Sequence, residues 1–490
     1  MAIKNKVNKF YITTAIDYPS ANPHLGHAYE KICADVIARW QRLNGKDVFF
    51  LTGTDEHGMK IQRAAEKQGK LPKEFVNEMV AKFQKLCQVL NISNDRFIRT
   101  TESEHERISQ EIFEEVYGNG DVYKGEYEGY YCVDCETFYL EKDAPNLECP
   151  IHKKPLETIK EESYFFKMSK YEKQIIEHIE QNKEFILPEY KQTEILNRLK
   201  QELKDLSVSR TSFSWGIPVP FDSKHVIYVW FDALINYLSG IEYGTKKFEK
   251  YWPADVHIIG KDILWHHSVI WPSMLLAAKI KLPKTILVHG FINLKGEKLS
   301  KSAGKVIDPI ELAEKYGSDI LRYYLLKDVV FGEDGDFSEQ GLQEKNNELA
   351  DKLGNLVSRL EGLAEKEMIK KCQQDKKLTS KLKIKEIQEK LDNYKLDKAL
   401  HLITDFLDEC NKYIQDEKVW TLEGEKRNKA LYTLVDSLRV TSIFLYPFIP
   451  ETAGKILERL NETHISLERA KFELLENISI KKQEILFKKL

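Results

Sequence analysis

Strand-like and helix-like segments alternate from the start of the chain to roughly residue 115. A β-prone run covers 10–14, and a helix pattern follows in which Ile32, Val36 and Trp40 share one apolar face. This pattern stops at Gly45, and a second buried-strand run covers 48–51. Strands that alternate with helices are typical of βαβ units, in which neighbouring strands are parallel. We therefore expect an α/β fold built on a parallel sheet.

The alternation is interrupted between residues 119 and 225, where the chain is rich in Tyr and Glu and contains a cysteine cluster. It resumes with apolar runs at 226–230, 256–260 and 286–290. From Gln343 to the end the sequence reads as amphipathic helix, broken only near two prolines. The sequence therefore predicts an α/β domain with an insertion, followed by an α-helical bundle.

Composition excludes several classes of protein. The chain has 490 residues, of which 42% are hydrophobic and 31% charged, so wholesale disorder is excluded. No apolar run approaches the ~20 residues that a membrane span needs. The N-terminus has no signal-peptide pattern, and we expect a cytoplasmic protein. The net charge of −3 gives no charge-based evidence for nucleic-acid binding.

Three of the seven cysteines are clustered. An odd number of cysteines without a secretory signal argues against a disulfide framework. Cys132-x-x-Cys135 and Cys149-x-x-His152 form two close pairs of ligands, which is the spacing of a structural Zn²⁺ site. A redox pair or a metal-free remnant is the alternative. We predict one structural zinc ion that holds the insertion together.

Two short motifs could bind phosphate. His24-Leu25-Gly26-His27 opens the first helix, and the N-terminus of a helix presents free N–H groups and a positive dipole end. Lys298-Leu299-Ser300-Lys301-Ser302 places two lysines three residues apart between hydroxyls, as in an anion clamp. A capping turn with incidental histidines and a solvated charge run are the respective alternatives.

Together, in this order on an α/β scaffold, the two motifs resemble those of the class I aminoacyl-tRNA synthetases. The resemblance narrows to the methionyl-tRNA synthetases through further segments of both halves of the α/β domain. These segments are 15–18 (AIDY), 53–58 (GTDEHG), 228–237 (YVWFDALINY), 260–263 (GKDI), 267–268 (HS) and 271–272 (WP).

The resemblance implies a Rossmann-type catalytic domain that activates L-methionine with ATP and Mg²⁺ and transfers it to the terminal adenosine of tRNA, for initiation and elongation of translation. His24, His27, Lys298 and Lys301 would be catalytic, and Gly26, Gly260, Asp262, Ser300 and Ser302 would bind ATP. The implied domains are 1–118 and 226–290 (catalytic), 119–225 (zinc-bearing insertion), 291–340 (linker with the lysine loop) and 341–490 (anticodon-binding bundle).

The resemblance also implies a methionine pocket. Asp55 would hold the substrate ammonium, and Tyr18 and His267 would offer polar contacts to sulfur. The side chains enclosing the thioether would be Ile16, Trp230, Ala233, Leu234, Tyr237, Ile263 and Trp271. Without the resemblance, the tryptophans read as core residues. Asp17 stands where the family usually has an aromatic residue or proline, and it either faces solvent or changes the rim of the pocket.

In the helical part, the family's anticodon readers match Asn355, Arg359 and Trp420, which implies tRNA(Met) with a CAU anticodon as the partner. Spacing alone indicates an ordinary bundle. No further domain follows the bundle, so we expect a monomer. The rival hypotheses are another class I synthetase, a nucleotidyltransferase that ignores tRNA, and a non-catalytic RNA-binding relative.

Overall fold

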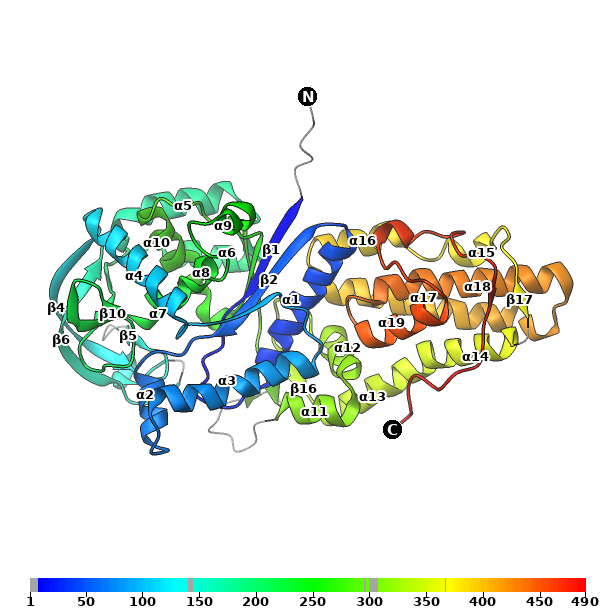
Figure 1. Ribbon diagram of the computed structural model, residues 1–490, viewed down its shortest axis with the longest axis horizontal. Helices are drawn as coiled ribbons and strands as arrows, with labels where there is room; N and C mark the ends of the chain where they lie inside the picture. The colour runs from blue at the N-terminus through cyan, green and yellow to red at the C-terminus, as the bar shows by residue number, and fades with distance from the viewer. Residues whose placement is uncertain (1–7, 140–143, 151, 295–296, 299–306, 366) are drawn as a thin grey trace, which may run out of the picture.

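The computed structural model describes residues 8–139, 144–150, 152–294, 297–298, 307–365 and 367–490. The molecule is elongated, with an α/β part at one end and a helical part at the other (Figure 1). A six-stranded sheet with only parallel pairings forms the α/β part. Its strands, in spatial order, are β3 (Arg96–Arg99), β2 (Asp47–Thr54), β1 (Lys9–Thr14), β12 (Val256–Gly260), β13 (Thr285–His289) and β7 (Ile186–Leu187).

Each face of the sheet is covered by its own hydrophobic core. Side chains alternate between the two faces of a strand, so Phe10 and Ile12 of β1 point into one core and Tyr11 into the other. Helix α1 (Leu25–Leu43) lies on the first face, and that core continues into the helical part. The second face is covered by the insertion and by α7 (Val229–Leu234), α8 (Asn236–Ser239) and α10 (Trp271–Ala277).

The remaining helices of the α/β part flank the sheet. They are α2 (Met59–Glu66), α3 (Pro72–Val89), α4 (Ser103–Gly118) and α9 (Lys246–Tyr251). Among its described residues, the segment 119–225 forms a four-stranded antiparallel sheet, two α-helices, two short 3₁₀ helices and small β-pairings. Its elements are β4 (Val122–Cys132), β5 (Thr137–Tyr139), β6 (Glu157–Phe166), α5 (Glu172–Gln181), α6 (Glu189–Arg198), β8 (Leu206–Ser207), β9 (Ser209–Arg210) and β10 (Pro218–Val219).

Helices also form the C-terminal part, where α14, α17 and α18 run side by side in Figure 1. The elements from 291 onward are β14 (Ile292–Leu294), β15 (Glu297–Lys298), α11 (Pro309–Tyr316), α12 (Ser318–Asp328), β16 (Gly335–Phe337), α13 (Glu339–Leu349), α14 (Asn355–Ala364), β17 (Met368–Ile369), α15 (Lys376–Thr379), α16 (Ile384–Asp392), α17 (Leu396–Asp416), α18 (Gly424–Leu445), α19 (Pro450–Arg459) and β18 (Ile478–Ser479). Among the described residues, no helix is long and apolar enough to cross a bilayer.

The predicted parallel-sheet α/β fold with a helical C-terminal part is confirmed, with three local differences. The apolar run 226–230 is not a strand of the main sheet, because β11 (Asp222–Ile227) pairs antiparallel with β9 and β10 and α7 begins at Val229. Strand β7 joins the main sheet from within the insertion. After Arg459 the chain is mostly irregular and runs back along the bundle instead of forming another α-helix (Figure 1). The predicted domain boundaries stay a prediction.

A buried ion pair joins the two parts of the molecule. Asp35 of α1 and Arg322 of α12 are both fully buried, and their charged atoms lie 2.7 Å apart. Arg322 also donates hydrogen bonds to the carbonyls of Leu90, Pro447 and Phe448, which come from opposite sides of the junction. Burial opposes the ionisation of Asp35, but Arg322 and Arg39 outweigh it and lower its pKa.

We predict that Arg322→Met destabilises the protein by about 3–5 kcal/mol near neutral pH, because it leaves the Asp35 carboxylate buried without its main partner. The measurement is urea unfolding followed by circular dichroism. The lowered pKa of Asp35 means that the pair stabilises the fold fully above the ordinary Asp pKa of about 3.9 and less as pH falls through the folded value. The difference between the two proteins should therefore shrink in acid. Lys455→Met, which removes an exposed pair with Glu451, should cost less than about 0.5 kcal/mol.

Candidate active site

The two histidines of the first motif cap helix α1. His24 is the N-cap residue, and its Nδ1 accepts the N–H of Gly26 at 3.1 Å. Nδ1 of His27 accepts the N–H of His24, also at 3.1 Å, which completes a reciprocal capping box. The rings stack with centroids 3.6 Å apart. Because both Nδ1 atoms are acceptors, the proton of each neutral ring is on Nε2, where it can be donated to an anion.

Gly26 allows this arrangement, because a Cβ there would lie 3.0 Å from Cε1 of His24. The N-terminus of α1 lies just beyond the carboxyl end of β1, where ligands bind in open α/β sheets. The positive end of the helix dipole and the Nε2–H groups of the two stacked rings therefore lie together at the start of α1, which suits a phosphate group.

The end of β12 adds a second polar edge. Gly260 is its last residue, and a Cβ there would lie 2.8 Å from Oδ1 of Asp262, whose side chain is exposed. Behind Gly260, the buried His289 bonds Glu30 of α1 at 3.0 Å. Burial opposes a charge on His289, but Glu30 outweighs it and raises its pKa. This buried ion pair was not predicted from the sequence, because its residues are 259 positions apart.

Asp55 directly follows β2 and is 8% exposed. Its Oδ1 has no hydrogen-bond partner among the described residues. Burial, reinforced by the negative charges of Asp232 and Glu136, raises the pKa of Asp55 well above its ordinary value. An orphan buried carboxylate is costly unless a cation or donor completes it. The geometry therefore provides a site for a cationic group of a ligand.

The side chains predicted to enclose methionine form a mostly neutral buried cluster around Tyr237. The Tyr237 hydroxyl bonds Nε2 of His267 at 2.7 Å, and Nδ1 of His267 donates to the carbonyl of Ile263 at 3.0 Å. Burial lowers the pKa of His267 to about 4 and that of His266 to about 3. Burial also lowers the pKa of His257, which contacts the Tyr237 ring. These histidines are therefore neutral at physiological pH.

A π-helical turn from His266 to Ile270 belongs to this cluster, and α10 begins directly after it at Trp271. Such turns are rare and are frequent at functional sites. Among the other residues predicted for the pocket, Ala233, Leu234 and Trp271 are buried, and Ile16, Ile263 and Trp230 are partly buried. Trp230 stacks on His266 at 3.8 Å. The structure thus brings the predicted enclosing residues together in one core region.

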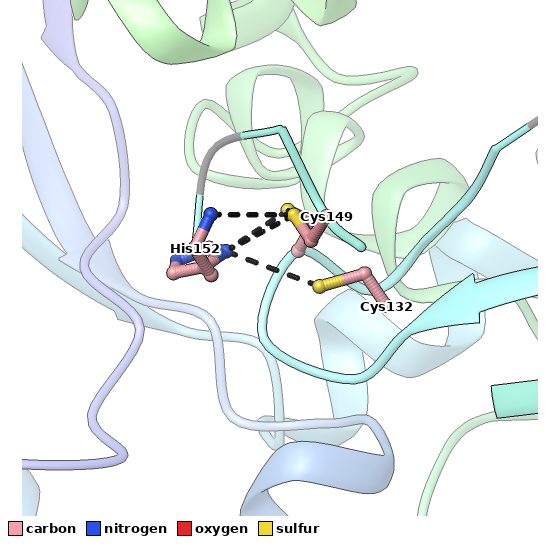
Figure 2. A group of neighbouring side chains, drawn as sticks. Cys132, Cys149 and His152 are labelled. Atoms are coloured by element: carbon pink, nitrogen blue, oxygen red, sulfur yellow. Dashed lines mark hydrogen bonds between the residues drawn. The ribbon is translucent and has the colours of Figure 1, made fainter. Parts of the chain in front are cut away.

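Four predicted metal ligands converge in the insertion. One ligand atom from each of Cys132, Cys135, Cys149 and His152 lies within 4.8 Å of every other. Figure 2 shows Cys132, Cys149 and His152 pointing toward one another. Sulfur–nitrogen distances run from 3.2 to 3.9 Å, and the Sγ atoms of Cys135 and Cys149 are 3.5 Å apart. These separations fit a tetrahedron with metal–ligand distances of about 2.0–2.3 Å, so the residues fit a metal ion.

This knuckle (residues 132–152) contacts the pocket directly. The carbonyl of Cys135 accepts the indole N–H of Trp230 at 3.4 Å, and Oε1 of Glu136 accepts the hydroxyl of Tyr18 at 3.2 Å. Tyr18 also donates to the carbonyl of His57, so its hydroxyl is already engaged. Gly58 has a φ of 105°, and a Cβ there would lie 2.6 Å from that hydroxyl. The sequence does not indicate a role for Glu136, because the spacing of the knuckle points only to its four metal ligands.

Asp232 organises a buried network that was also missed. It bonds Nδ1 of His57 at 2.7 Å and Nε2 of His105 at 2.6 Å. Burial opposes its ionisation, but His57 and His105 outweigh burial and lower the pKa of Asp232. Asp232 lies within the quoted segment 228–237, but its partners are far away in the sequence. The network ties α7 to the turn that follows Asp55.

Asp17 does not face solvent, which excludes one of the two expectations. Its side chain is 3% exposed and forms an ion pair with Lys31 of α1. The other phosphate motif is only partly described. Lys298 is in strand β15, and nothing is described of its side chain, while Ser300, Lys301 and Ser302 lie outside the described residues.

The predicted anticodon readers lie in the helical bundle. Asn355 begins α14 directly after a π-helical turn and bonds Asn411 of α17 at 3.2 Å. Arg359, one turn further along α14, is partly buried. Trp420 is 49% exposed. Arg427 donates to the carbonyls of both Val419 and Leu363, which holds the Trp420 turn against the end of α14.

Known proteins show the same organisation. The family model described as class I tRNA synthetases (M) matches residues 10–155 and 140–361, and that of the anticodon-binding domain of tRNA ligases matches 375–488. The methionine–tRNA ligase of Caldanaerobacter subterraneus subsp. tengcongensis is 44% identical over 98% of this chain and 78% of its own length. The chain belongs to the methionyl-tRNA synthetases. The Bacillus subtilis methionine–tRNA ligase is 42% identical, over 99% of this chain and 78% of its own length.

Among solved structures, Mycobacterium tuberculosis methionyl-tRNA synthetase in complex with methionyl-adenylate superimposes with a TM-score of 0.95 at 37% identity, covering 98% of this chain and 99% of that one. The prediction of a class I methionine–tRNA ligase is thereby confirmed. The individual roles of the predicted site residues stay predictions.

Proposed function

We propose that the chain activates L-methionine with ATP as methionyl-adenylate and transfers the methionyl group to the terminal adenosine of tRNA(Met) for both initiation and elongation. The observation that carries this proposal is Oδ1 of Asp55, a buried carboxylate oxygen that has no hydrogen-bond partner among the described residues, while the backbone N–H of Asp55 bonds Asp17 beside His27. An amino acid placed with its ammonium on Asp55 and its side chain in the pocket has its carboxylate free to react.

In the activation step, a carboxylate oxygen of methionine attacks the α-phosphorus of ATP and pyrophosphate leaves. Negative charge builds on the phosphoryl oxygens, and preorganised donors stabilise it. His24 and His27 would donate through their Nε2–H groups, and Gly26 lets the phosphates approach the start of α1. Lys298 and Lys301 would neutralise the leaving pyrophosphate, with Ser300 and Ser302 beside them. Mg²⁺ bound with ATP would supply further charge neutralisation.

Orientation of the two substrates supplies the rest of the catalysis. Gly260 and Asp262 would bind the adenosine, with the Asp262 carboxylate accepting from a ribose hydroxyl. In the methionine pocket, the neutral histidines avoid placing a charge against the thioether, which packs well against aromatic edges. An apolar pocket distinguishes substrates by about 1–3 kcal/mol per methylene, so fixed polar groups such as the Tyr237–His267 pair must contribute to selection.

The first test is ATP–pyrophosphate exchange with a panel of amino acids and an Asp55→Asn variant. Methionine should support exchange far better than leucine, isoleucine, valine or cysteine. Asp55→Asn should raise KM for methionine by about 10–150-fold, because it removes a charge-assisted hydrogen bond worth about 1.5–3 kcal/mol. Because burial raises the pKa of Asp55 and only the ionised form pairs with the ammonium, KM for methionine should rise as pH is lowered from about 8 toward about 5.

The matched control is Asp405→Asn on the exposed face of α17. It should leave KM for methionine and KM for ATP unchanged. Exchange supported by another amino acid and not by methionine would disprove the substrate assignment. A normal KM for methionine in the Asp55→Asn protein would disprove the role of Asp55.

We propose that the knuckle binds one structural Zn²⁺ through Cys132, Cys135, Cys149 and His152. The four ligands leave no open position for substrate, and they are the soft and borderline donors that zinc prefers. The ion would hold the backbone of Cys135 and Glu136 in place, and through it the two pocket contacts to Trp230 and Tyr18.

Removal of zinc by a chelator, or the Cys149→Ser substitution, should raise KM for methionine by about tenfold, since positioning hydrogen bonds are worth about 1 kcal/mol each. KM for ATP should change by less than about twofold. Metal content by mass spectrometry and tryptophan fluorescence provide readouts that do not depend on activity. Cys372→Ser, at a cysteine of the helical part, is the control and should retain one equivalent of metal. A metal-free protein with an unchanged KM would contradict the coupling.

We propose that Asn355, Arg359 and Trp420 read the CAU anticodon. The half-exposed indole of Trp420 could stack on an unpaired base, which is worth about 1–3 kcal/mol. Trp420→Ala should therefore lower kcat/KM for tRNA charging by about 10–100-fold and leave ATP–pyrophosphate exchange unchanged. Met368→Ala, at another exposed apolar residue of the helical part, should change neither reaction. Equal charging by the Trp420→Ala and unaltered proteins would exclude this role. The monomeric state and the cytoplasmic location stay predictions.

A further inference from the structure

An ion pair that none of the expected roles uses is buried beside the phosphate-binding start of α1. Lys31 is fully buried, Asp17 is 5% exposed, and Nζ of Lys31 lies 2.5 Å from Oδ2 of Asp17. Burial opposes the charge on both residues: it raises the pKa of Asp17 in spite of Lys31, whereas at Lys31 the effect of burial is outweighed by Asp17 together with Cys87 and Glu30, which raise the pKa of the ammonium. Two opposite charges without access to water are stable only while both are present.

The pair reaches the catalytic motif through His27. Lys31 follows His27 by four residues, so the two side chains lie on the same face of α1. Oδ1 of Asp17 is 3.9 Å from Nε2 of His27. This is the nitrogen that carries the ring proton, because Nδ1 of His27 accepts the N–H of His24. The carboxylate thus attracts the same N–H that would serve the phosphates.

The main chain of Asp17 connects this corner with the methionine site. Its N–H donates to the carbonyl of Gly53, and its carbonyl accepts the N–H of Asp55, both at 2.8 Å. One residue therefore bonds the end of β2 through its backbone and places its carboxylate 3.9 Å from Nε2 of His27. Its position is fixed from both sides, as a group that orients another side chain requires.

We propose that Asp17 is a positioning residue for the activation reaction and that Lys31 is its neutralising partner. The charge of the Asp17 carboxylate favours the orientation of the His27 ring in which Nδ1 accepts the N–H of His24 and Nε2 carries the proton. An unpaired carboxylate at this place would repel ATP, and Lys31 cancels that repulsion. The proposal rests on the ATP-dependent activation proposed above, but it assigns separate roles to two residues that the reaction scheme does not include.

The two roles predict different kinetic defects in ATP–pyrophosphate exchange. Lys31→Met leaves the carboxylate uncompensated, so KM for ATP should rise at least about tenfold, while KM for methionine stays within about twofold. Asp17→Asn removes the restraint and not the cation, so kcat should fall about tenfold without a rise in KM for ATP. The double variant should return KM for ATP to within about threefold of the unaltered protein and keep the low kcat.

The matched control is Lys327→Met, because Lys327 is a buried lysine of α12 that bonds Thr404 of α17. It should change neither parameter. A merely structural role of the Asp17–Lys31 pair would instead change both KM values together, in proportion to the loss of thermal stability of each variant, and the double variant would not restore KM for ATP. That pattern would overturn the proposal.

If the Lys31→Met protein does not fold, the Asp17→Asn and Lys31→Arg proteins test the proposal instead. Lys31→Arg keeps the cation and should keep KM for ATP within about threefold, and an unchanged kcat in a folded Asp17→Asn protein would overturn the positioning role. The failure of the wider assignment is distinguishable, because the unaltered protein would then show no methionine-dependent exchange at all.

Discussion

The buried charges along helix α1 need partners from other parts of the chain, and this requirement constrains how the rest of the molecule packs. His27, Lys31, Asp35 and Arg39 are spaced four residues apart and share one face of a helix whose side chains are nearly all buried. A charge in such a place is tolerated only when a partner meets it. Asp17 meets Lys31, and Arg322 of the helical part meets Asp35. The loop after β1 and the C-terminal half of the molecule must therefore both be in place before this helix is stable.

This constraint links architecture to chemistry. The same helix that joins the α/β part to the bundle carries the two capping histidines at its N-terminus, so the side chains proposed to bind phosphate are fixed on a helix that packs into the core shared by both parts. In the neighbouring cluster around Tyr237, by contrast, the buried titratable histidines are uncharged. Burial keeps His257, His266 and His267 neutral, and among the described residues Oδ1 of Asp55, the oxygen proposed to hold the substrate ammonium, has no hydrogen-bond partner. The charged side chains along α1 and the neutral histidines around Tyr237 thus form two separate groups at the same edge of the sheet.

The sequence predicts features that depend on residues close together in the chain, and it does not predict contacts between residues far apart in the chain. The strand and helix alternation, the histidines at the start of α1 and the Cys₃His knuckle are local patterns, and the structure has them where the sequence predicts. Residues such as Glu136 could not be assigned, because the role of Glu136 depends on Tyr18, a partner more than a hundred residues away. The run 226–230 was apolar enough for a buried strand, but tertiary contacts turned its second half into α7. The tail after Arg459 packs on the bundle without repeating a helix.

Asp17 shows why a departure from a family pattern is informative only together with its surroundings. A carboxylate in place of an aromatic residue or proline suggests a polar rim when the sequence is considered alone. In the fold, the residue points inward, and Lys31, fourteen positions later and two helical turns into α1, supplies the countercharge. Neither residue would be stable there without the other, because each would leave a buried ion uncompensated. The pair must therefore be regarded as one unit. Because Asp17 lies 3.9 Å from His27 and its backbone bonds Gly53 at the end of β2 and Asp55, the pair joins the two halves of the proposed active site.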